Sequence, residues 1–97
     1  MNRVIGGGKA AVRSTKHVYI GRGSVWGNPF RIGPDGTREE VIAKYRARFY
    51  SLENLQCLAK VELAGKTLVC HCKPLACHGD VLAEYLAQFE PKQGVLL

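Results

Sequence analysis

Residues 67–86 read TLVCHCKPLACHGDVLAEYL, and this stretch decides the fold. Its first three residues predict a short buried strand, which leads into a segment with three cysteines and two histidines. After Pro74 the apolar residues recur at helical spacing and predict a helix from about Cys77 to Phe89. The buried stripe of this helix is expected to consist of Val81, Leu82, Tyr85, Leu86 and Phe89.

Two helices are expected before that strand. Thr37-Arg38-Glu39-Glu40 fits a capping box, so a helix should begin after Thr37 and bury Val41, Ile42, Tyr45 and Phe49. A shorter helix is expected from Leu55 through Leu63, closed by Gly65, with Cys57 in the core.

Two short apolar runs near the start of the chain predict the remaining strands, Val4–Ile5 and His17–Ile20. The glycines at 6–8 precede Lys9, but the rest of a phosphate-loop pattern is absent, so we expect a flexible turn. Helices between the last two strands favour parallel pairing through a right-handed crossover. The sequence therefore predicts one α/β domain over residues 1–97: a small, mostly parallel three-stranded sheet with about three helices, Rossmann-like, in two or three layers.

Composition sets limits on the class of protein. The chain has 97 residues, 46% hydrophobic and 23% charged, which is typical of a single globular domain. Its net charge of +6 favours anionic partners such as nucleotides or nucleic acid. No apolar stretch is long enough to span a membrane and no signal peptide is visible, so we expect a cytoplasmic protein. Its four cysteines are then expected to be thiols, metal ligands or catalytic groups.

The cysteine segment has two functional interpretations. Cys70, Cys72, Cys77 and His78 match a Cys3His zinc set in ligand type, although the spacing is unusual and His17 or His71 could replace one ligand.

Without a metal, Cys77, His78 and Gly79 would occupy the first turn of the last helix, where free amides favour an anion. Cys77 would then be a nucleophile with a lowered pKa, and His78 or Asp80 a base or an orienting group. Capping of the helix is the alternative role for Asp80. Simple burial is the alternative for Cys70 and Cys72.

A second polar loop follows the His17–Ile20 strand. Arg22 is the best anion-binding candidate in it, because a guanidinium can hold phosphate or carboxylate bidentately. Asn28 could contact a base or hold the loop, and Trp26 could stack on a ring or fill the core. In a parallel sheet this loop and the cysteine segment lie at the same edge, where ligands bind in open α/β sheets.

Two motifs also carry a resemblance. The sequence GRGSVWGNPF at 21–30 and the sequence CHCKPLACHGDVL at 70–82 resemble a family of small bacterial and phage proteins known as a domain of unknown function. The resemblance covers roughly residues 17–89, which leaves residues 1–16 and 90–97 as peripheral. It implies signature roles for Arg22, Trp26, Asn28, Arg38, Cys70, Cys72, Cys77, His78 and Asp80.

Three functions remain open from the sequence, and it does not decide whether the chain is an enzyme. The first is a site for a nucleotide-like or other phosphate-bearing ligand. Arg22, Ser24, Trp26, Asn28, Arg38 and Gly79 would bind this ligand, and Cys77, His78 or Asp80 would perform any chemistry. The second is a zinc-stabilised module that binds nucleic acid. The third is a phage-type protein that binds a host factor.

Overall fold

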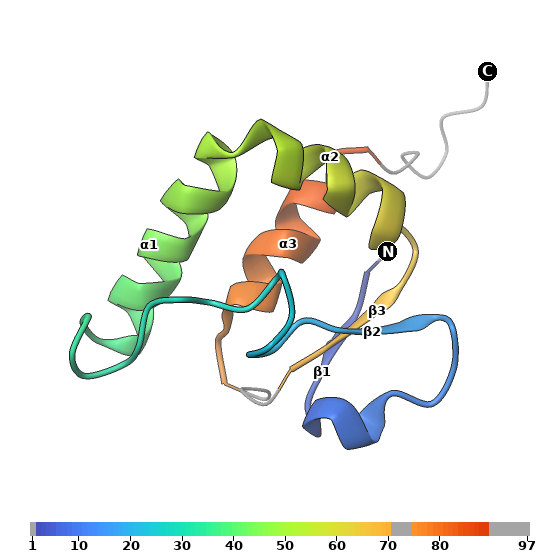
Figure 1. Ribbon diagram of the computed structural model, residues 1–97, viewed down its shortest axis with the longest axis horizontal. Coiled ribbons are helices and arrows are strands. Elements are labelled where there is room, and N and C mark those ends of the chain that lie inside the picture. The colour runs from blue at the N-terminus through green and yellow to red at the C-terminus, as the bar shows by residue number, and fades with distance from the viewer. Residues whose placement is uncertain (1, 71–74, 90–97) are drawn as a thin grey trace.

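The computed structural model describes residues 2–70 and 75–89 (Figure 1). Its three strands form one parallel sheet in the order β1-β3-β2: β1 is Val4–Ile5, β2 is His17–Tyr19 and β3 is Thr67–Val69. Its helices are η1 (Gly8–Ala11, a 3-10 helix), α1 (Arg38–Ser51), α2 (Glu53–Glu62) and α3 (His78–Ala87). The predicted α/β fold with a small parallel sheet and three α-helices is therefore confirmed.

The register of the sheet brings the ends of all three strands to one level. Val69, the last residue of β3, pairs with Ile5 on one side and with Tyr19 on the other. The next residues extend this pairing, since the Ile20 N–H donates to the Val69 carbonyl at 2.8 Å and the Cys70 N–H to the Ile5 carbonyl at 3.0 Å. The chain therefore leaves the sheet at the same edge after each strand.

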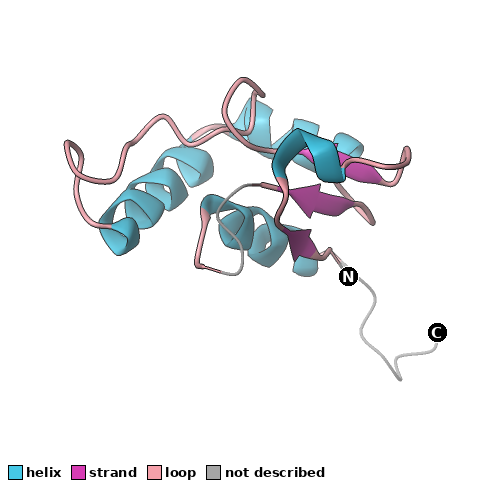
Figure 2. Ribbon diagram, turned by 90° about the horizontal axis from the view of Figure 1, so that it is seen from below, coloured by secondary structure: helices cyan, strands magenta, loops and turns pink. Residues whose placement is uncertain are grey.

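Helices cover the two faces of the sheet unequally. The three α-helices lie together on one side of the strands, while the short η1 lies on the other side (Figures 1 and 2). The glycine run was expected to form only a turn, but it leads into this 3-10 helix. Gly7 and Gly8 have φ of 101° and 59°, a left-handed backbone that glycine adopts without steric cost.

The helix starting at Thr37 confirms the predicted capping box. The Thr37 hydroxyl accepts a hydrogen bond from the Glu40 N–H at 3.2 Å, and the Glu40 carboxylate accepts from the Thr37 N–H at 2.8 Å. The helix then buries Val41, Tyr45 and Phe49, three of the four predicted core residues. No helix within residues 2–70 and 75–89 has the length and apolar character needed to cross a membrane.

Two predicted core residues lie on the surface. Phe89 is 53% exposed because α3 ends at Ala87, and its ring is contacted by the Lys60 ammonium, 4.6 Å from the centroid. Cys57 is exposed because α2 packs through a narrow stripe that contains Leu58 and Ala59, and Cys57 lies outside that stripe. The remainder of the α3 stripe is buried as predicted, namely Val81, Leu82, Tyr85 and Leu86.

Candidate functional site

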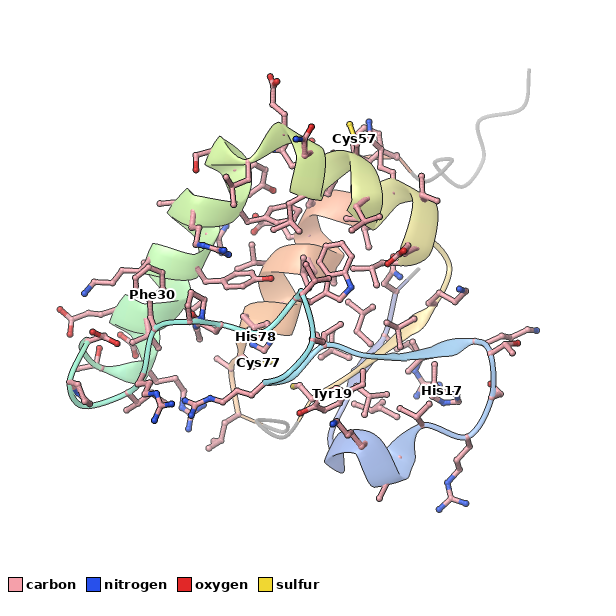
Figure 3. The ribbon with its side chains drawn as sticks, viewed as in Figure 1. His17, Tyr19, Phe30, Cys57, Cys77 and His78 are labelled. Carbon is pink, nitrogen blue, oxygen red and sulfur yellow. The ribbon has the colours of Figure 1, made fainter. Side chains whose placement is uncertain are left out.

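A cavity of about 510 Å³ opens at the edge of the sheet where the strands end. This volume lies in the range of small-ligand sites. Segments far apart in the sequence meet there, and Figure 3 shows Cys77 and His78 at the start of α3, with Tyr19 near the end of β2. The lining residues are Tyr19, Gly21, Arg22, Asn28, Phe30, Ile32, Arg38, Val41, Ile42, Cys70, Ala76, Cys77 and His78.

Two arginines supply the charge of this cavity. Arg38 lies at the first position of α1, and its guanidinium donates to the carbonyl oxygen of Ala76 at 3.1 Å. Arg22 follows β2 and is exposed, and among the described residues no side chain or carbonyl forms a hydrogen bond or ion pair with its guanidinium. The described lining contains no Asp or Glu. The two positive charges are therefore not neutralised by a described lining residue.

His78 is buried at the start of α3 and forms a hydrogen bond with Ile20, the residue that follows β2. Its Nε2 lies 2.6 Å from the carbonyl oxygen of Ile20, and its ring centroid lies 5.0 Å from that of Tyr45. A carbonyl only accepts, so Nε2 carries the proton and donates it. Burial lowers the pKa of His78 below its usual 6.5, despite the bond to Ile20. The imidazole is therefore neutral at pH 7, and its Nδ1 is the acceptor.

Gly79 explains how the start of α3 reaches the sheet. A Cβ at this position would lie 2.8 Å from Ile20 Cδ1 and 2.8 Å from Val4 Cγ1, closer than real Cβ contacts. The absent side chain thus permits the approach that places His78 against Ile20. The sequence predicted that the Gly79 amide binds an anion. The structure shows a packing role for this glycine. Binding of an anion by its amide stays a prediction.

Cys70 and Cys77 meet across the loop that joins β3 to α3. Both are buried, and their sulfurs lie 3.1 Å apart. The pKa of the Cys77 thiol is raised, chiefly by its hydrogen bond to Cys70 and then by burial. This corrects the predicted lowering of the pKa by the helix start. The helix start itself is capped, since the Cys77 N–H donates to the Asp80 carboxylate at 3.1 Å.

Only three of the four predicted zinc ligands, Cys70, Cys77 and His78, lie within the described residues. Cys70 and Cys77 are together, but Cys72 lies outside the described residues, as does His71. His78 directs Nε2 to a backbone carbonyl. Within the described part of the chain, no three His, Cys, Asp or Glu side chains come together as a metal site. Zinc binding stays a prediction.

The predicted residues of the second loop mainly build the loop itself. Ser24 donates from its hydroxyl to the Gly21 carbonyl at 2.7 Å, and Trp26 is 2% exposed, in the core. Asn28 borders the cavity, but its amide donates to the Val41 carbonyl at 3.2 Å and its oxygen accepts from the Phe30 N–H at 2.9 Å. These side chains hold the cavity wall in place.

Some lining residues were missed by the sequence interpretation. From the sequence, Tyr19 was expected only to form part of a strand, and Phe30 only to end the motif at 21–30. Ile42 was expected to be buried in the helix core. All three border the cavity, together with Ile32. For Tyr19 a signal existed, because it is the last residue of a strand whose end faces the ligand edge. For the others, an apolar side chain in a loop or on a helix gives no such indication.

The chain belongs to the family described as a domain of unknown function (DUF4326), whose model matches residues 6–88. This confirms the resemblance seen in the two motifs. A relative from Enterobacteria phage T4 is described as an "Uncharacterized 12.4 kDa protein in nrdA-td intergenic region". It is 37% identical over 75 residues, which cover 73% of this chain and 68% of the relative. No solved structure matches the chain.

Proposed function

We propose that the cavity binds a small anionic ligand with a planar ring, of the nucleotide class. The observation that carries this proposal is the guanidinium of Arg22, which lies at the cavity without a hydrogen-bond or ionic partner among the described residues. Elsewhere in the structure, by contrast, the Arg46 guanidinium forms an ion pair with the carboxylate of Glu84. An unpaired arginine at a cavity suits an external anion.

The phosphate end of the ligand would bind between Arg22 and Arg38. These residues come from the loop after β2 and from the start of α1, so their positions are set by different elements. Two guanidinium groups with no carboxylate in the described lining attract an anion. The net charge of +6 adds to this attraction at longer range.

The ring end of the ligand would use the apolar wall. Tyr19 and Phe30 offer aromatic faces, and Ile32 and Ile42 add aliphatic contact. The Tyr19 hydroxyl donates to the Arg22 carbonyl at 3.1 Å, which fixes the ring next to the arginine that would hold the phosphate. Stacking of a base on an aromatic side chain contributes about 1–3 kcal/mol.

Any chemistry on the ligand would involve His78. Its ring lines the cavity, its low pKa keeps it neutral, and its Nε2 is occupied by Ile20. In any proton transfer, Nδ1 is the atom that would accept the proton, because Nε2 is bonded to Ile20. Cys77 is less suited to be the nucleophile, because its raised pKa keeps it in the thiol form.

Thermal unfolding with and without a mixture of the common ribo- and deoxyribonucleoside 5′-monophosphates tests the proposal. A ligand that binds only the folded chain raises Tm by mass action. The expected result is a rise in Tm with the nucleotides and a smaller one with the corresponding nucleosides. No rise with either set contradicts the proposal.

Arg22→Ala and Arg13→Ala form a matched pair for this experiment, because each removes one positive charge but only Arg22 borders the cavity. A charge-assisted hydrogen bond contributes about 1.5–3 kcal/mol, so Arg22→Ala should weaken binding about 10- to 100-fold. Arg13→Ala should bind like the unmodified protein. Equal loss in the two variants would indicate only a general charge effect.

A further inference from the structure

The two buried cysteines at the cavity are held in contact by separate parts of the backbone. Cys70 directly follows β3, and its N–H donates to the Ile5 carbonyl at 3.0 Å. Cys77 directly precedes α3, and its N–H donates to the Asp80 carboxylate at 3.1 Å. Each residue is 1–2% exposed, and both line the cavity. The 3.1 Å contact between the sulfurs therefore results from the way that β3 and α3 are placed.

We propose that Cys70 and Cys77 form an oxidisable dithiol site, which a hydroperoxide converts to a disulfide in the cavity wall. The sulfurs need to approach by only about 1 Å to reach disulfide length. Their burial limits access to oxidants small enough to enter the cavity, such as hydrogen peroxide. This inference goes beyond the proposed ligand and does not depend on it.

The reaction is balanced in two steps. One of the two thiols, as the thiolate, attacks one oxygen of hydrogen peroxide, the O–O bond breaks, and water leaves with the proton that the thiol gave up, so this cysteine becomes a sulfenic acid. The sulfur of the other cysteine then attacks the sulfenic acid sulfur. The S–O bond breaks, the S–S bond forms, and a second water leaves with the proton of the second thiol. The peroxide is reduced to two molecules of water, and the two thiols are oxidised to one disulfide.

Either cysteine can react first, because the two sulfurs are in contact and either thiol can donate the hydrogen bond between them. The other cysteine is already in place to attack the sulfenic acid.

Counting of thiols by mass spectrometry tests the inference in the full chain. Cys57→Ala is a suitable background, because Cys57 is exposed and away from the cavity, and it leaves three of the four cysteines. After treatment with hydrogen peroxide, removal of the peroxide and alkylation under denaturing conditions, two thiols should be lost. A reducing agent should restore both.

Three further variants in this background identify the pair. Cys72→Ala replaces neither cysteine of the proposed pair, so this protein should still lose two thiols reversibly. Cys70→Ala and Cys77→Ala should each show no reversible loss of two thiols at the same peroxide dose. The proposal is overturned if the Cys72→Ala protein keeps both thiols. It is equally overturned if the Cys77→Ala protein loses two, which would join Cys70 to Cys72. The Cys72→Ala protein keeps both Cys70 and Cys77, so it tests the proposal even if the Cys70→Ala and Cys77→Ala proteins fail to fold.

Discussion

His78 connects the start of α3 to the end of β2, and its proton content should affect stability. Burial lowers the pKa of His78 in the folded chain below the usual 6.5, so the unfolded chain binds the proton more tightly. The stabilisation is complete above pH 6.5 and is lost as the pH falls through the folded-state pKa. The free energy of unfolding, measured by chemical denaturation, should therefore decrease between about pH 7 and pH 5.

His78→Gln is the control for this pH dependence. Glutamine can still donate a hydrogen bond to the Ile20 carbonyl but does not titrate. The decrease in this pH range should become shallower in the variant. Equal slopes in the two proteins would show that other groups are responsible. The pKa of Glu40 is lowered below its usual 4.5 by its hydrogen bonds with Thr37. Its protonation therefore changes the free energy of unfolding only at more acidic pH.

Gly79 gives a second prediction at the scale of single residues. Gly79→Ala places a methyl group against Ile20 and Val4, and overpacking of this kind costs about 1–3 kcal/mol. Chemical denaturation should show a loss in this range. The matched test is the same change in a Val4→Ala background, which removes the contact with Val4 and keeps the one with Ile20, so the cost should be smaller. An equal cost in both backgrounds would contradict the close contact with Val4.

Single residues also show which features of the site could be predicted from the sequence and which could not. Arg22 was singled out because a guanidinium can hold phosphate or carboxylate bidentately, and it borders the cavity. Trp26 and Asn28 have two uses each, and only the fold decides between them: Trp26 fills the core, while Asn28 bonds to the backbone at Val41 and Phe30. The contact between Cys70 and Cys77 depends on the path of the chain between β3 and α3. Spacing along the sequence does not determine that path.

At the scale of elements, the start of α1 provides a quantitative prediction. Thr37→Ala removes the hydroxyl that accepts the Glu40 N–H, and the loss of such a cap costs about 1 kcal/mol of the free energy of unfolding. The control is Thr15→Ala, at an exposed turn position, where a change within about 0.5 kcal/mol is expected. If chemical denaturation gives equal losses for the two variants, the cap does not contribute as described.

Elements with strong local signals were predicted well. The capping box at Thr37 and the stripe of α3 come from patterns within one element, and both are present. The exposure of Cys57 and Phe89 was not predictable in this way, because it depends on which face of α2 is covered and on where α3 ends. The 3-10 helix after β1 was missed because a glycine run allows many backbone paths.

At the scale of the whole molecule, the order of elements was sufficient to predict a parallel sheet. Helices between β2 and β3 require a crossover, and a crossover gives parallel strands. The order of strands, with β3 between β1 and β2, depends on contacts between distant residues and was not predicted. This order places Cys70, which follows β3, beside the loop that follows β2. Both border the cavity.

An NMR titration of the isotope-labelled protein with the nucleoside 5′-monophosphate mixture tests the central claim most directly, because it reports both binding and its location. The amide signals of Arg22, Cys70 and His78, which border the cavity, should shift and saturate. The signals of α2, which contributes no residue to the cavity lining, should stay in place. Unchanged signals throughout, or shifts confined to α2 or other surfaces away from the cavity, would contradict a nucleotide site at this edge of the sheet.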